Sequence, residues 1–310
     1  MNQGLAYALA SMAPRFAGVF TALVTPFHED GSLDLDSYRA LVRAQLDAGI
    51  SGLVACGTTG EASTLSTQEH LAVVRACQDE VRGRVPVIAG AGANDTLEAM
   101  KMHQRVAELG VDASLQVTPW YNKPTQEGLY RHFRAIAESN PLPIILYNVP
   151  GRTGVDMLPD TIVRLAKECP SIAAVKEATG SIQRAQEILN RVERKDFSVL
   201  SGDDGLILGL LAIGGHGVIS VTSHLCAQEL SRMCHAFHEG NIAEAQALSK
   251  RTSPLSTILF FRANPIPVKT ALVLTGKIKG LAAHFRLPLC PLDDGETAQL
   301  KKMLEAEKWL

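Results

Sequence analysis

The sequence predicts an α/β fold, a (β/α)8 (TIM) barrel with a C-terminal helical appendage, from three observations. Eight short apolar runs alternate along the chain with segments of helical period. The connections between them are short, as in parallel strands joined by right-handed crossovers. After the eighth run only helical patterns remain, roughly over residues 225–310.

Each expected strand is a nearly continuous apolar run, which is typical of parallel strands covered on both faces. In chain order the runs are GVFTALVTP from Gly18, GLVACG from Gly52, PVIAGAG from Pro86, ASLQVTP from Ala113, PIILYNVP from Pro143, IAAVKEA from Ile172, SVLSGDD from Ser198 and HGVISV from His216. Eight such strand-helix units close most naturally into a barrel.

The helices are expected between these strands. The segments with helical period are SYRALVRAQLDAG, TQEHLAVVRACQDEV, TLEAMKMHQRVAELG, EGLYRHFRAIAES, LPDTIVRLAKE, SIQRAQEILNRV and GLILGLLAIGG. Ser66, followed three residues later by Glu69, predicts a capping box at the start of the second segment. Helices are expected to stop at Gly49, Gly110 and Gly214.

An open doubly wound sheet is the alternative architecture for the same alternation. Its dinucleotide fingerprint, G-x-G-x-x-G, is missing after the first strand, and GAGAND after the third is only a weak echo. The barrel is therefore preferred. The chain then divides into a loosely ordered N-terminal extension (residues 1–16), the barrel (17–224) and a helical region (225–310), in which NPIPVK at 264–269 opens a helix with a proline turn.

The composition narrows the class of partner. Of the 310 residues, 46% are hydrophobic and 20% are charged, which supplies a large core and argues against disorder. The net charge of -2 leaves no basic surplus for phosphates, so we expect a small-molecule partner and no nucleic acid. Six cysteines without a C-x-x-C pair indicate neither disulfides nor a zinc site. With no signal-peptide pattern and no membrane-length apolar segment, we expect a cytoplasmic protein without membrane contact.

One residue departs from the pattern of a buried strand. In IAAVKEATG, Lys176 follows four small or β-branched apolar residues. In a barrel the reacting groups come from the C-terminal ends of strands, and a lysine that points into an apolar interior loses hydration, which favours its neutral amine. A desolvated lysine is suited to attack a carbonyl and form a Schiff base.

The alternative is a lysine at the rim of the strand that pairs with Glu177 or with a helix carboxylate. Strand alternation sends Lys176 and Glu177 to opposite faces, so Glu177 is a poor partner. The other expected strand ends also carry reactive polar side chains, namely Thr58, Thr59, Tyr121, Tyr147 and Arg152. Spacing alone leaves both interpretations of the lysine open.

Six ordered motifs give the sequence a resemblance to a known family. CGTTGEASTLS, YNVPGRTG, AVKEATG, LSGDDG, GGHGVISV and NPIPVK occur in that order over about residues 17–305. In this pattern the chain resembles the dihydrodipicolinate synthases, within the N-acetylneuraminate lyase superfamily of class I aldolases. The resemblance implies a homo-oligomeric enzyme of lysine and diaminopimelate biosynthesis that condenses pyruvate with L-aspartate 4-semialdehyde to 4-hydroxy-tetrahydrodipicolinate.

The resemblance also implies the catalytic residues. Lys176 is similar to the Schiff-base lysine, which would take up pyruvate covalently without any cofactor or metal. Tyr147 matches the acid/base tyrosine, whose proton would pass through the hydroxyl of Thr58 and a second tyrosine. Tyr121 matches that second tyrosine, which in the family enters from the neighbouring subunit. A dimer would then be needed for activity, and dimers of this family commonly pair into tetramers.

Further positions are implied to bind substrate. Thr59 resembles the residue that grips the pyruvate carboxylate with its hydroxyl and its backbone N–H. Arg152 matches the arginine whose planar fork holds the semialdehyde carboxylate. Gly202 and Ile219 match positions that contribute backbone groups near the site.

Asp203 and Asp204 could act as paired acids. Asp204, which precedes GLILGLL, reads equally well as a helix cap, and the cap is the preferred interpretation.

A regulatory lysine site is implied by a partial match. His70, Asn94 and Glu98 match polar positions of the allosteric site found in some branches of the family. Thr67 stands where lysine-sensitive bacterial sequences often carry histidine, and Trp120 replaces the usual tyrosine at the shared cleft.

Three other signals are interpreted as structural, and a fourth is left without a role. Cys56 is expected to be core packing, because no positioned histidine accompanies it. His235 and His238, three residues apart without a third ligand, are expected on a solvated helix face. GAGAND is expected to be a strand-to-helix turn, and His216 receives no role.

Two rival functions remain. One is another pyruvate-dependent aldolase of the superfamily, such as a sialic acid or sugar-acid lyase, whose members generally lack arginine at the position of Arg152. The other is a non-catalytic barrel that senses a keto acid or an amino acid. The joint presence of Lys176, Tyr147, Thr58 and Tyr121 argues against the second.

Overall fold

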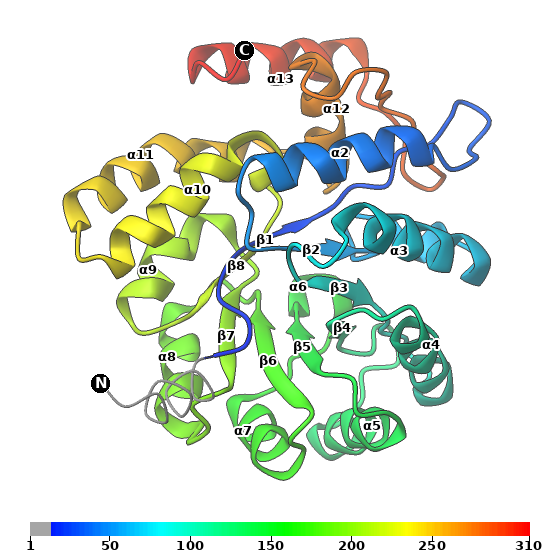
Figure 1. The fold of residues 1–310 in the computed structure, drawn as a ribbon, viewed down its shortest axis with the longest axis vertical. Helices are drawn as coiled ribbons and strands as arrows, with labels where there is room; N and C mark the ends of the chain where they lie inside the picture. Colours follow the sequence, from blue (N-terminus) through cyan, green and yellow to red (C-terminus); the bar gives the residue numbers. More distant parts are fainter. Residues whose placement is uncertain (1–13) are drawn as a thin grey trace. The chain divides into compact units, whose positions relative to one another are not determined.

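The computed structural model describes residues 14–310 and contains a closed barrel of eight parallel strands in chain order (Figure 1). The strands are β1 (Gly18–Ala22), β2 (Gly52–Ala55), β3 (Val87–Gly90), β4 (Ala113–Val117), β5 (Ile144–Asn148), β6 (Ile172–Glu177), β7 (Ser198–Ser201) and β8 (Gly217–Ser220). All eight lie in the runs expected from the sequence. The (β/α)8 prediction is therefore confirmed, and the open sheet is excluded.

The strands are buried along almost their whole length, as their apolar composition requires. Every residue of β2, β3, β5, β6, β7 and β8 is buried. A strand covered on both faces cannot show polar alternation, which explains why these runs read as continuous apolar stretches.

The helices also follow the predicted segments. They are α2 (Leu35–Asp47), α3 (Thr67–Val81), α4 (Thr96–Glu108), α5 (Gln126–Ser139), α7 (Pro159–Glu168), α8 (Ile182–Arg191) and α9 (Ile207–Ala212). The capping box at Ser66 and Glu69 is present in both directions, which confirms the predicted start of α3. Gly49 and Gly110 follow their helices with φ of +75° and +74°, a left-handed backbone that glycine adopts without strain.

The C-terminal part is helical, as expected. It contains α10 (Ser223–His238), α11 (Ile242–Ile258), α12 (Ile266–Leu274) and α13 (Asp294–Ala306). Helix α12 begins within NPIPVK, with Pro265 as its N-cap residue. Three one-turn helices were not expected from the sequence, namely η1 (Ala62–Thr64), α6 (Pro150–Thr153) and η2 (Asp204–Leu206), because a single turn is too short to show a helical period.

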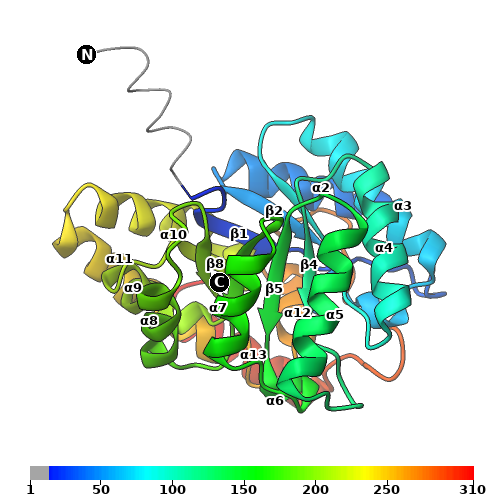
Figure 2. The same ribbon diagram turned by 90° about the horizontal axis from the view of Figure 1, so that it is seen from below.

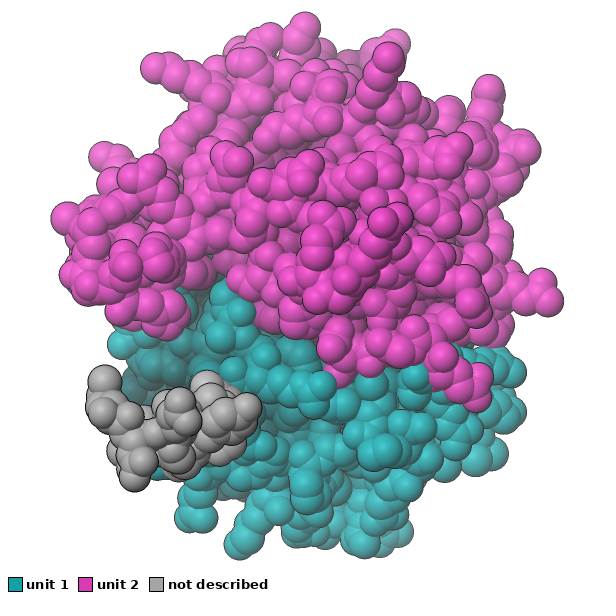
Figure 3. Space-filling view, viewed as in Figure 1, with its two compact units in different colours: residues 1–18, 91–107, 113–218 teal, residues 19–90, 108–112, 219–310 magenta. Residues whose placement is uncertain are grey.

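Two compact units make up the described chain (Figure 3). Unit 1 comprises residues 14–18, 91–107 and 113–218, and unit 2 comprises residues 19–90, 108–112 and 219–310. The predicted division into an extension, a barrel and a helical region remains a prediction. Most of the expected extension, residues 1–13, lies outside the described residues.

Unit 1 is built around one apolar core. Helices α5, α7 and α8 pack side by side on the outside of its strands (Figures 1 and 2). Their inward faces carry Phe133, Ile136, Ile162, Leu165 and Ile188, all completely buried. Burying one such side chain contributes about 1.5–3 kcal/mol, so this face fixes the strands that carry the site residues of unit 1.

Unit 2 joins the first three strands to the C-terminal helices. Helix α10 packs on α11 and α12, and α13 packs on α11 and α12. Phe27, Tyr38 and Leu41 are completely or almost completely buried in this unit. No helix in residues 14–310 combines the length and the apolar character that crossing a membrane would require.

Candidate active site

Lys176 on β6 lies directly beside Tyr147 on β5. The two residues are partners in the parallel register of these strands. Lys176 is 7% exposed, and its Nζ lies 4.1 Å from the centroid of the Tyr147 ring. Within residues 14–310, the Lys176 amine forms neither a hydrogen bond nor an ion pair. Lysines are rarely buried without a partner. Because no partner occupies this amine, it is a candidate nucleophile.

Glu177 points away from Lys176, as strand alternation predicted. Its carboxylate accepts hydrogen bonds from Arg184 Nε at 3.1 Å, from the Thr179 backbone N–H at 2.9 Å and from Asn148 Nδ2 at 3.4 Å. Asn148 and Glu177 are partners in the same register, one step beyond Tyr147 and Lys176. The network therefore ties β5 to β6 next to the lysine without supplying it with a counter-charge.

The backbone of Gly202 packs against the side chain of Lys176. Its backbone N–H donates to the Glu177 carbonyl at 2.7 Å. A Cβ atom added at Gly202 would lie 2.5 Å from the Ala178 Cβ and 3.1 Å from the Lys176 Cε. Only glycine therefore leaves room for the lysine stem at this position. The structure brings Lys176, Tyr147 and Gly202 together.

The helix cap expected at Asp204 is formed by Asp203. The Asp203 carboxylate accepts a hydrogen bond from the Gly205 backbone N–H at 2.9 Å, and Asp204 is the first residue of η2. The prediction was wrong by one residue because the helix opens with a one-turn 3-10 segment, which shifts the cap position.

Arg152 and Tyr121 lie in the loops that follow β5 and β4. Arg152 is an exposed residue of the one-turn helix α6. Tyr121 is 88% exposed, has a φ of +74°, and its backbone N–H donates to the Thr153 carbonyl at 3.3 Å. A left-handed backbone is unusual for tyrosine. The high exposure shows that the side chain points away from the rest of unit 1.

Thr58 and Thr59 follow β2 in unit 2, in the loop of residues 57–61 (GTTGE), the threonine loop. Thr58 is exposed, whereas Thr59 is 3% exposed. The Thr59 hydroxyl accepts a hydrogen bond from Asn264 Nδ2 at 2.9 Å. Ile219, on β8 of the same unit, is 1% exposed. Asn264, which opens the motif NPIPVK, was not predicted as a site residue.

The residues of the predicted lysine site have separate partners. Asn94 Nδ2 donates to the Trp120 carbonyl at 3.4 Å, and Glu98 pairs with Lys101 at 2.7 Å. His70 is buried, its Nε2 lies 2.8 Å from the Gly90 carbonyl oxygen, and burial lowers its pKa. The regulatory site remains a prediction.

The structural interpretations of three other signals are confirmed. Cys56 is 2% exposed, and burial raises the pKa of its thiol, which disfavours the nucleophilic thiolate. His235 and His238 are exposed at the end of α10. In GAGAND, Asp95 accepts a hydrogen bond from the Glu98 backbone N–H at 2.9 Å, so the segment is a strand-to-helix turn.

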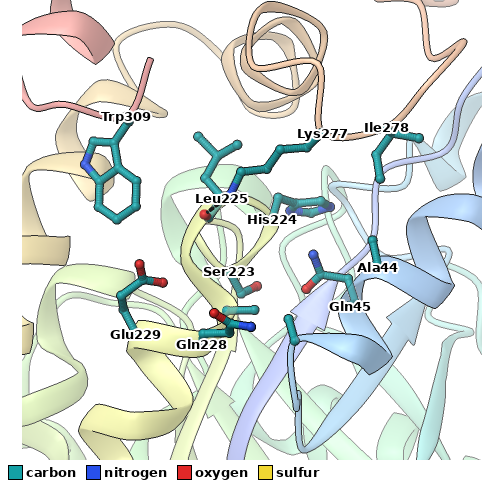
Figure 4. A pocket seen from close by; sticks show the side chains of 12 residues that line it. Ala44, Gln45, Ser223, His224, Leu225, Gln228, Glu229, Lys277, Ile278 and Trp309 are labelled. Carbon is teal, nitrogen blue, oxygen red and sulfur yellow. Dashed lines mark hydrogen bonds between the residues drawn. The ribbon is translucent and has the colours of Figure 1, made fainter.

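A cavity of about 250 Å³ lies elsewhere in unit 2, between α2, the start of α10 and the C-terminal segment (Figure 4). Several of its polar side chains already have hydrogen-bond partners. Gln45 accepts from the Thr21 hydroxyl at 2.7 Å, His224 accepts from the Val24 N–H at 3.2 Å, and Lys277 donates to a backbone carbonyl. Burial lowers the pKa of His224 to about 4. None of the predicted catalytic residues lines this cavity.

Comparison with known proteins agrees with the resemblance seen in the sequence. A model of the dihydrodipicolinate synthetase family matches residues 15–307. The 4-hydroxy-tetrahydrodipicolinate synthase of Maridesulfovibrio salexigens is 49% identical over 291 residues, which cover 94% of this chain and 98% of that protein.

Two solved structures extend the similarity to the whole fold. The dihydrodipicolinate synthase of Thermotoga maritima is 41% identical, with a TM-score of 0.91 over 95% of this chain and 99% of that chain. The chloride-inhibited dihydrodipicolinate synthase of Acinetobacter baumannii, complexed with pyruvate, is 44% identical, with a TM-score of 0.90 over 95% of this chain and 99% of that chain.

Proposed function

This chain belongs to the dihydrodipicolinate synthetase family, and we propose that it condenses pyruvate with L-aspartate 4-semialdehyde to 4-hydroxy-tetrahydrodipicolinate in lysine biosynthesis. The observation that carries the proposal is the buried amine of Lys176, which is without a hydrogen bond or ion pair within residues 14–310 and lies 4.1 Å from the Tyr147 ring centroid. A curated relative with 49% identity bears the name of this activity, and a structural relative is complexed with pyruvate.

The chemistry begins at Lys176 Nζ. The neutral amine attacks the keto carbon of pyruvate, and loss of water gives a Schiff base. The iminium nitrogen then acts as an electron sink, so the methyl group loses a proton and becomes an enamine. The enamine carbon attacks the aldehyde carbon of the semialdehyde, and hydrolysis or cyclisation releases the lysine. No cofactor enters these steps.

Tyr147 is proposed to move the protons, because its ring lies next to the amine. Thr58 and Tyr121 extend this relay, with Tyr121 supplied by the partner subunit of a dimer. The 88% exposure of Tyr121 supports this arrangement, since a side chain that protrudes from its own unit is available to a second copy. The proposal also includes the pairing of dimers into tetramers and a cytoplasmic location.

The two carboxylates of the substrates are proposed to have separate binding groups. Thr59 holds the pyruvate carboxylate through its hydroxyl and N–H, and Arg152 holds the semialdehyde carboxylate through its fork of donors. Gly202 and Ile219 contribute backbone groups. Arg152 favours the semialdehyde over keto-sugar acids, because a guanidinium matches a two-oxygen anion.

Trapping with borohydride tests the covalent step. The protein is incubated with pyruvate and borohydride, digested and analysed by peptide mass. We expect a reduced pyruvate adduct on the Lys176 peptide. The Lys269 peptide serves as the matched control, because Lys269 is also buried but is bound to Glu61. An unmodified Lys176 peptide would favour the sensing barrel. Steady-state assays with the semialdehyde and with keto-sugar acids then separate the synthase from its aldolase rivals.

A further inference from the structure

The threonine loop is held by two residues of the C-terminal helical region, both at or near the start of α12. Asn264 precedes this helix and donates to the Thr59 hydroxyl at 2.9 Å. Lys269, in the first turns of the helix, binds Glu61 at the other end of the loop. Both contacts are buried and join residues more than two hundred positions apart in the chain.

The hydrogen bond from Asn264 determines what the Thr59 hydroxyl can do. A threonine hydroxyl has one proton to donate and two lone pairs that accept. The Asn264 amide occupies a lone pair, so the hydroxyl proton points elsewhere. Within residues 14–310 no acceptor for that proton is found. The hydroxyl is therefore oriented as a donor toward an external acceptor, and a carboxylate oxygen is the acceptor that the proposed substrate supplies.

The ion pair at Lys269 fixes the loop backbone. All three ammonium hydrogens are used, by Glu61 Oε1 at 2.5 Å, by the Thr25 carbonyl at 2.8 Å and by the His284 carbonyl at 2.9 Å. Glu61 has a φ of +53°, a left-handed backbone that a glutamate rarely adopts. The buried pair therefore holds the loop in a conformation that the chain would not favour by itself.

We propose that Asn264 is a positioning residue that sets the Thr59 hydroxyl as a hydrogen-bond donor to the carboxylate of the keto acid. This inference rests on the proposed function. Lys269 and Glu61 hold the loop that carries Thr59, and Asn264 selects the direction of the hydroxyl proton. The N-terminal turn of α12 is thus part of the machinery that recognises the first substrate.

A double-mutant cycle tests the inference. The variants are Asn264→Ala, Thr59→Val and their combination, with Thr270→Val as the matched control. Thr270 is a buried threonine of α12, and within residues 14–310 its hydroxyl donates only to the Ile266 carbonyl of the same helix. The variant Thr270→Val therefore reports the effect of damage to the helix alone. The readouts are kcat, the KM for each substrate and the pyruvate concentration that half-saturates borohydride trapping, together with unfolding by urea.

We expect Asn264→Ala to raise the KM for pyruvate and the half-saturating concentration about 5–10-fold, as for one lost hydrogen bond, with the KM for the semialdehyde within about twofold. Because Asn264 acts through the hydroxyl, the double variant should bind pyruvate no more weakly than Thr59→Val alone. Asn264→Asp should be worse than Asn264→Ala, because a carboxylate would accept the Thr59 proton and withdraw it from the substrate.

Additive effects of Asn264→Ala and Thr59→Val, an equal rise in both KM values, or the same pyruvate effect in Thr270→Val would each overturn the inference. Failure of the proposed function has a different signature, since the unmodified protein would then show no pyruvate adduct at Lys176. A wild-type protein that is trapped normally, with an Asn264→Ala variant of unchanged half-saturation, refutes only the role of Asn264.

Discussion

Lys176 on β6 and Lys269 on α12 are the two lysines of residues 14–310 that are buried, and their surroundings are opposite in kind. Lys269 is completely buried, donates all three of its hydrogens and is paired with Glu61. Burial lowers the pKa of Lys269, and the Glu61 carboxylate opposes this effect. Lys176 is nearly as buried, but it lies beside the Tyr147 ring and pairs with no carboxylate of residues 14–310.

The contrast separates structural from chemical uses of the same side chain. A fully hydrogen-bonded ammonium has no lone pair to donate, so the contacts of Lys269 tie the threonine loop to α12. An unpaired amine contributes little to folding, because no partner is left behind when it is removed. Burial alone therefore does not mark a candidate nucleophile, whereas burial without a partner does.

Removal of the Lys176 amine should give the largest functional effect. We expect Lys176→Ala to lose at least about 10³-fold in turnover, which is about 4 kcal/mol in activation free energy, because in the proposed reaction no other group forms the covalent intermediate. Its free energy of unfolding in urea should stay within about 1 kcal/mol of the wild type. A variant that is unfolded by circular dichroism would instead make Lys176 a structural lysine and remove the contrast.

Removal of the Lys269 ammonium should give the largest effect on stability. Lys269→Met leaves the Glu61 carboxylate buried without a counter-charge, so we expect a loss of about 3–5 kcal/mol in the free energy of unfolding. The double variant Lys269→Met/Glu61→Leu, which removes both charges, should recover most of that loss. Urea denaturation of the three proteins measures the difference. A single variant as stable as the wild type would show that the pair is not the tie described above.

The two lysines also differ in how well the sequence predicts them. Lys176 interrupts a run of apolar residues in a strand, and a cation there conflicts with the expected burial, so the sequence alone marks it. Lys269 lies in a helical segment, where a lysine is ordinary, and its partner Glu61 is 208 residues away. Long-range pairing of two common charged residues leaves no local pattern.

The same reasoning explains the other successes and failures. Strand positions and the capping box of α3 were predictable, because periodicity and cap chemistry are local. The one-turn helices and the capping role of Asp203 were missed, because they depend on backbone details shorter than any period. The Asn264 contact with Thr59 was also missed, because it joins residues 205 positions apart and leaves no local pattern. The roles of the site residues come from family resemblance, because no local pattern specifies which substrate group a side chain binds.

A glycine beside Lys176 offers an intermediate test of the contrast. In Gly202→Ala the added Cβ would lie 2.5 Å from the Ala178 Cβ and 3.1 Å from the Lys176 Cε, so the segment after β6 must shift and displace the lysine stem. We expect a loss of roughly 10–100-fold in turnover, because small displacements of a reacting group are costly. Gly209→Ala is the control, since its Cβ would meet only the Ile182 side chain at 3.4 Å and alanine favours a helix. Equal activity of both variants would mean that the position of the amine is not critical.

The smallest effect is expected from a partly exposed counterpart of the Lys269 pair. Arg286 binds Glu69 at 2.5 Å, and its guanidinium lies 4.6 Å from the centroid of the same Phe27 ring that Lys269 contacts. The hydrogen bond from Arg286, with help from Ser66, lowers the pKa of Glu69 from 4.5 to about 2. A carboxyl group whose pKa is lower in the folded state than in the unfolded state stabilises the protein at pH values above the unfolded pKa. For Glu69 this contribution disappears as the pH falls from about 4.5 to about 2.

Glu69→Gln isolates this charge, because glutamine can still complete the capping box of α3. We expect the variant to be less stable than the wild type by about 1 kcal/mol at pH 7, in line with the modest strength of partly exposed pairs. The difference should shrink progressively in urea denaturation at pH 5, pH 4 and pH 3, as the wild-type carboxyl loses its advantage. A difference that stays constant over this range would assign the stability to the shape of the side chain and not to its charge. In that case solvent would screen the pair of Arg286 and Glu69 completely. Of the two pairs, only the fully buried pair of Lys269 and Glu61, which holds the threonine loop, would then stabilise the protein by electrostatic attraction.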